Sequence, residues 1–136
     1  MFSKKDNKGF TLMEMLIVVA IIAILIAIMI PVFNAQLEKS REAADAANIR
    51  SAYAEVMVCA IDGEESGDVT KDATTGAFKA VVELGQEQSD WQNTDLGTNL
   101  AKLGTVTGTP AQGGSCTVSV ATGASDYGTV TIAFED

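Results

Sequence analysis

Glu14 is the residue whose type and position most clearly predict a chemical role. It stands directly before nineteen residues, 15–33, that contain no charged side chain. A carboxylate beside such a run is costly when the run enters hydrocarbon, so it needs a cationic partner. Just upstream, a lysine is followed by Gly9-Phe10. This border between a basic leader and an apolar run suits cleavage by a protease at the cytoplasmic membrane face.

The uncharged run predicts a helix that spans a membrane. Nineteen residues rise about 28 Å, close to the thickness of the hydrocarbon layer. Residues 1–9 hold three lysines and one aspartate, so they should stay in the cytoplasm, with the rest outside. A secretory signal peptide would be shorter and would end in a small-residue cleavage site, and a buried core helix would keep a polar face. A plain anchor explains the run but not Glu14 or the Gly9-Phe10 border.

These features carry a family resemblance. The string KGFTLMEMLIVVAIIAIL resembles the class III signal of type IV prepilins and related pseudopilins, in detail over residues 4–33. The resemblance implies that a prepilin peptidase cuts between Gly9 and Phe10, and that Phe10 is then N-methylated. It also implies that Glu14 pairs with the N-terminus of a neighbouring subunit, setting the register of a filament. An intrachain pair with Phe10, four residues away, has equally suitable spacing.

Helical patterning continues beyond the uncharged run. Strong helix formers follow Pro31, and Asp62-Gly63 supplies a stop signal, so we expect one helix from about Phe10 to about Ile61. Pro31, at a position where the family often has proline, should bend the helix; the alternative is that it ends the anchor. The apolar face of the second half is predicted at Phe33, Leu37, Ala44, Ile49, Ala52, Tyr53, Val56 and Ala60. The charges between these positions should face water.

The remaining residues predict a small β-rich head. Alternation and β-branched residues predict strands at 77–84, where a helix is the alternative, and a hairpin of 116–121 and 129–134. Loops are expected at 63–76, 85–99 and 104–114, with a short turn at 100–103 capped by Thr98 or Asn99. The expected fold is α+β and pilin-like, with the helix's second half packed on three or four antiparallel strands.

Composition excludes several function classes. The net charge is −9, and residues 62–136 hold twelve acids against three bases, which argues against binding nucleic acid. The chain has no histidine and no nucleophile–base pair or phosphate loop, so we expect neither an enzyme nor a cofactor. The acids Asp62, Glu64, Glu65 and Asp68 lack the spacing of a calcium loop and favour a solvated loop, with no metal site.

Cys59 and Cys116 leave two alternatives open. Outside the cytoplasm they could form a disulfide that closes a long loop, which would stabilise the head by about 3–4 kcal/mol. The alternative is a pair of buried free thiols.

The sequence therefore divides into a leader at 1–9, a membrane or filament-core segment at 10–33, an amphipathic segment at 34–61 and a head at 62–136. The resemblance implies a structural subunit, the major one, of a type IV pilus, with roles in adhesion and motility. Its partners would be its own copies, the prepilin peptidase and methyltransferase, and the assembly platform. It would sit in the cytoplasmic membrane, head outside, before joining an extracellular pilus.

The runner-up is a pseudopilin of a type II secretion or competence system, which would share the same helix. The second alternative comes from a different class of protein. A membrane-anchored extracellular binding domain would keep residues 1–9.

Overall fold

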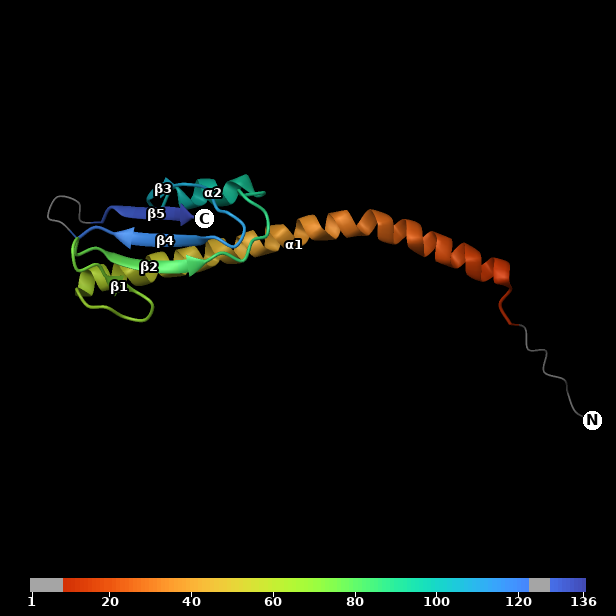
Figure 1. Cartoon of the computed structure of the whole chain (residues 1–136), viewed down its shortest axis with the longest axis horizontal. Helices are drawn as coiled ribbons and strands as arrows, with labels where there is room; N and C mark the ends of the chain where they lie inside the picture. The colour runs from red at the N-terminus through yellow and green to blue at the C-terminus, as the bar shows by residue number, and fades with distance from the viewer. Residues whose placement is uncertain (1–8, 123–127) are drawn as a thin grey trace, which may run out of the picture. The chain divides into compact units, whose positions relative to one another are not determined.

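A computed structural model describes residues 9–122 and 128–136 (Figure 1). The elements are α1 (Leu12–Asp62), β1 (Thr70–Lys71), β2 (Phe78–Glu83), α2 (Thr94–Leu100), β3 (Thr105–Thr107), β4 (Ser115–Val120) and β5 (Val130–Glu135). The chain divides into two compact units after Gln36, and α1 runs through the division. Most of the leader and most of the predicted hairpin turn at 122–128 lie outside the described residues.

The first unit contains the N-terminal part of α1. Pro31 lies inside the helix, so the prediction that the helix continues past it is confirmed. Proline lacks the N–H that would bond to the preceding turn, and the helix tolerates this loss. By length and composition α1 could cross a membrane, and its apolar stretch is exposed throughout this unit. Side chains such as Leu12 and Ile24 are more than 60% exposed, so this surface needs hydrocarbon or other helices to cover it.

The second unit packs the rest of α1 against a five-stranded sheet, and Figure 1 shows β2 and β4 lying over this part of the helix, with β5 beside β4. The strand order is β1-β2-β4-β5-β3. In β4 every second residue is buried, as expected of a strand with one face on a core. Ile49 and Val56 from α1 meet Phe78, Val118 and Ile132 from the sheet in one hydrophobic core.

The predicted α+β class is confirmed, as are the long helix and the three strands that alternation predicted. The prediction of three or four strands, all antiparallel, was wrong in count and direction. β1 and β3 form inside segments expected to be loops, and β3 runs parallel to β5. A Cβ at Gly104 would lie 2.4 Å from the carbonyl oxygen of Val130, so glycine is what allows the chain to approach β5 here.

The predicted turn at 100–103 is present, since the Leu103 N–H donates to the Leu100 carbonyl oxygen at 2.9 Å, but it continues a helix that was not predicted. This helix, α2 at Thr94–Leu100, lies inside the expected loop. Its N-cap is Asn93, whose side chain accepts a hydrogen bond from the Asp95 N–H, and not Thr98 or Asn99. Asparagine is among the strongest N-cap residues, so Asn93 was an available signal for the start of α2 that the prediction missed.

The expected face of the second half of α1 was partly wrong. Ile49, Ala52, Val56 and Ala60 are buried as predicted, whereas Phe33, Leu37 and Ala44 are exposed. Three acids expected to face water are buried instead: Glu38, Glu42 and Asp45. Hydrogen bonds to a loop, described below, explain how a helix face with three carboxylates can be buried.

Candidate functional site

The predicted cleavage bond lies in an exposed segment that is not helical. Gly9 and Phe10 both precede α1, and the Phe10 side chain is 82% exposed. A methyl group added at Gly9 would meet no atom of the described residues within 4 Å. Packing against the described part of the chain therefore does not require glycine at this position.

Glu14 has a local structural role that the sequence analysis missed. Its carboxylate oxygen Oε2 accepts a hydrogen bond from the Thr11 N–H at 2.9 Å. In return, the Glu14 N–H donates to the Thr11 hydroxyl oxygen at 3.2 Å. This reciprocal pair is a capping box, and the Thr-x-x-Glu spacing before an apolar run was the available signal. The cap satisfies backbone N–H groups at the start of α1, and among residues 9–122 and 128–136 no cation forms an ion pair with Glu14.

The predicted ion pair of Glu14 needs a group that cleavage would create. In the uncut chain the Phe10 nitrogen belongs to a peptide bond and carries no charge. Cleavage after Gly9 would turn it into an ammonium, next to the residue whose side chain caps the helix. The choice between an intrachain pair and a pair with a neighbouring subunit stays a prediction.

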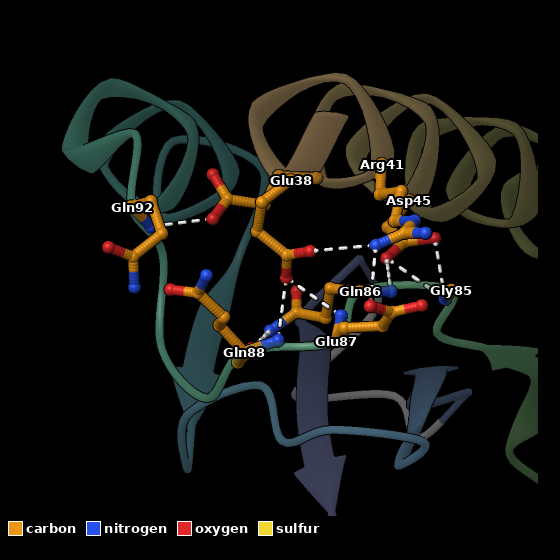
Figure 2. A network of polar contacts seen from close by, with 9 residues as sticks. Glu38, Arg41, Asp45, Gly85, Gln86, Glu87, Gln88 and Gln92 are labelled. Carbon is orange, nitrogen blue, oxygen red and sulfur yellow. Dashed lines mark hydrogen bonds and ion pairs between the residues drawn. The ribbon is translucent and has the colours of Figure 1, made fainter. Parts of the chain in front are cut away.

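A second constellation lies in the head, where three buried carboxylates of α1 hold residues 85–93 (Figure 2). We call Glu38, Glu42 and Asp45 the carboxylate clamp. Asp45 accepts hydrogen bonds from the backbone N–H groups of Gly85 and Gln86 at 2.9–3.0 Å. The other two carboxylates accept N–H groups further along the loop in the same way.

Glu38 and Glu42 extend the clamp toward α2. Glu38 accepts the N–H groups of residues 87 and 88 at 2.7 and 2.6 Å. Glu42 accepts those of Gln92 and Asn93 at 2.7 and 2.9 Å, and Asn93 is the N-cap of α2. The clamp therefore fixes both the loop and the start of the second helix, because each carboxylate satisfies donors that would otherwise be buried alone.

Arg41 adds the one cation in this network. Its guanidinium lies 3.3 Å from Glu38 and 2.9 Å from Glu87. Figure 2 draws these ion pairs as dashed lines. The side-chain oxygen of Gln86 is buried without a hydrogen-bond partner, while its amide nitrogen donates to the Gln88 carbonyl. Every clamp oxygen is occupied by N–H donors, so the arrangement holds a loop in place and offers no free base for chemistry.

The spacing of the clamp residues was visible in the sequence, but the sequence did not show whether they face water or the interior of the head. Residues 38, 42 and 45 follow steps of four and three, which place them on one helix face. Acids on a helix are usually solvated, so the pattern favoured a helix face exposed to water. Their partners lie 40 to 51 residues away in the chain. These partners are backbone N–H groups, which nearly every residue type has, so the sequence does not mark them.

Cys59 and Cys116 are free and buried in the structure, which corresponds to the alternative of two buried thiols without a disulfide. Burial raises the pKa of the Cys116 thiol to about 12. The acids of the 62–68 loop are exposed. Across residues 9–122 and 128–136, no group of three or more His, Cys, Asp or Glu side chains is placed to hold a metal ion.

Cys116 should resist alkylation in the folded chain. With a thiol pKa of about 12, only about one molecule in ten thousand is a thiolate at pH 8, and the thiolate is the reactive form. We expect iodoacetamide at pH 8 to leave Cys116 unlabelled under native conditions and to label both cysteines in denaturant. Peptide mass spectrometry would measure this. A chain that takes up no label in denaturant without reductant would instead contain the disulfide.

Comparison with known proteins identifies the N-terminal segment. Residues 4–30 match the family model of the prokaryotic N-terminal methylation motif. A type IV major fimbrial protein, FimA of Dichelobacter nodosus, is 43% identical over 68 residues, which are 48% of this chain and 42% of that protein. Over these 68 residues the chain is homologous to a type IV fimbrial protein.

A second FimA sequence from the same organism extends the match. It is 43% identical over 82 residues, 58% of this chain and 51% of that protein. The chain thus spans about half the length of the curated relatives it matches. No solved structure matches it. The resemblance of the N-terminal segment to type IV prepilins is confirmed.

Proposed function

We propose that this chain is a structural subunit, the major one, of a type IV pilus. The observation that carries the proposal is the combination of the methylation motif at residues 4–30 with an apolar helix left uncovered in the first unit. A helix of this kind needs a bilayer before assembly and other helices afterwards. Copies of the same chain supply such helices in a filament.

The proposed sequence of events begins in the membrane. The leader stays in the cytoplasm, and a prepilin peptidase cuts between Gly9 and Phe10, after which Phe10 is N-methylated. The new ammonium and Glu14 then form an ion pair as assembly-platform proteins move the subunit from the membrane into the filament. Pairing is favourable there because an isolated charge in hydrocarbon is costly.

The first test is the N-terminus of the chain in its own cells. Mass spectrometry of the purified protein should find N-methylated Phe10 as the first residue, with residues 1–9 removed. A chain that keeps these residues would instead be an anchored extracellular domain, which contradicts the proposal. Recovery of the chain in sheared surface filaments is the second requirement. A correctly processed chain that is found only in the membrane would favour a secretion or competence pseudopilin.

A further inference from the structure

The charges exposed on α1 within the head are separated into two flanks. Lys39 and Arg50 are exposed and lie eleven residues apart, about three helical turns, so they share one side of the helix. We call them the cationic flank. Glu55, five residues after Arg50, points about 140° away around the helix axis and is also exposed.

The cationic flank has no partner within the described part of the chain. Of the lysines and arginines in residues 9–122 and 128–136, Arg41 and Lys79 form ion pairs, Lys71 lies over a phenyl ring and Lys102 donates to an amide oxygen. Lys39 and Arg50 have no such contact. The acid closest to Lys39 in helical spacing, Glu42, is buried and occupied by loop N–H groups. By turning its acids inward, the carboxylate clamp leaves the outer cations uncompensated.

The opposite flank is acidic and hollowed. Glu55 and Asp68 line a surface groove of about 440 Å³ between α1 and the loop that follows it. We call these two residues the acidic flank. Val58 and Ala54 supply an apolar part of the same groove. The connecting residues 62–68 contain four acids and no base, which adds to the negative potential.

An uncharged strip separates the flanks. Ser40, Ala47, Ser51, Ala54 and Val58 are exposed and lie between them around the helix. Small side chains let another surface approach closely, and the flanking charges determine which surface fits. A surface that is positive on one side and negative on the other matches a translated and rotated copy of itself, and such a heterologous contact repeats without closing.

We propose that the cationic flank of one copy of this chain docks on the acidic flank of the next, with Arg50 entering the groove lined by Glu55 and Asp68. This inference rests on the proposed filament function and adds a second, head-level contact that selects the register between neighbours. Charge complementarity of this kind contributes mainly specificity, since like charges brought together in a wrong register repel.

Charge reversal in the full chain tests the docking. Arg50→Glu and Glu55→Arg should each lower the fraction of the chain recovered in sheared filaments about tenfold, because each brings like charges together. The double variant, which exchanges the two charges, should return to within about twofold of wild type. Lys102→Glu is a control that changes net charge equally at an exposed site outside both flanks.

The outcomes separate this inference from the proposed function. A wild-type chain that forms no filaments contradicts the function itself. Wild-type filaments with an unaffected Arg50→Glu variant overturn the docking alone. The same holds if Lys102→Glu loses as much as Arg50→Glu, or if the double variant stays low while its membrane pool and head stability are normal.

Discussion

Glu14→Gln should abolish filaments while leaving the leader cleaved and the helix intact. Glutamine can still accept the Thr11 N–H, because its side-chain oxygen can replace the carboxylate in a capping box. It cannot pair with the ammonium of Phe10. Leaving that ammonium buried without its partner costs about 3–5 kcal/mol for each subunit contact, a factor of about two hundred to several thousand in affinity. Filament recovery from sheared cells and the N-terminal mass measure the two effects.

Thr11→Ala is the matched control for this prediction. It removes the hydroxyl that caps α1 but keeps the charge of Glu14. Loss of the cap should cost only about 0.5–2 kcal/mol of helix stability, so filaments should persist. If Glu14→Gln assembles normally, no essential ion pair exists at this residue. If Thr11→Ala fails as completely as Glu14→Gln, the cap and not the charge is what assembly needs.

Glu42→Ala should be the most damaging single truncation in the carboxylate clamp. The Glu42 side chain is fully buried and accepts the N–H groups of Gln92 and Asn93. Each donor left buried without an acceptor costs about 1–3 kcal/mol, so the head should lose about 2–6 kcal/mol. Its melting temperature should fall by about 10 °C or more. Thermal unfolding of the full chain in detergent, followed by circular dichroism, measures the change.

Two further variants provide reference values for the stability loss of Glu42→Ala. Glu42→Gln keeps one acceptor oxygen for two N–H donors, so its stability should lie between wild type and Glu42→Ala. Glu64→Ala removes an acid of the same type from an exposed loop and should change stability by less than about 0.5 kcal/mol. A Glu42→Ala chain as stable as Glu64→Ala would mean that water replaces the carboxylate at no cost.

Glu14 and the clamp acids thus have different structural roles on the same helix. Glu14 caps the start of the helix and is proposed to pair with a charge that only processing creates. The clamp acids pair with backbone N–H groups of the head and hold the loop that leads into α2. Neither set is arranged for catalysis, and both act through the cost of leaving a polar group unpaired in a nonpolar environment.

Local sequence signals predicted the elements whose stability is local. The uncharged run at 15–33 and the helix formers after Pro31 predicted α1 nearly to its ends. Alternation predicted β2, β4 and β5, because a strand with one face on a core must repeat every two residues. The string around Glu14 predicted a prepilin-like segment, and residues 4–30 match the methylation motif.

What the tertiary structure alone decided were the pairings between distant segments. β3 contains only three residues and is held by its parallel pairing with β5. Glu38, Glu42 and Asp45 look like a solvated stripe until loop 85–93 covers them with N–H donors. Periodicity records which residues share a face, but not whether that face meets water or backbone donors some 50 residues away. The sequence by itself therefore determined the long helix and the motif at its N-terminal end. Only folding brought three acids of that helix into contact with the backbone N–H groups of loop 85–93.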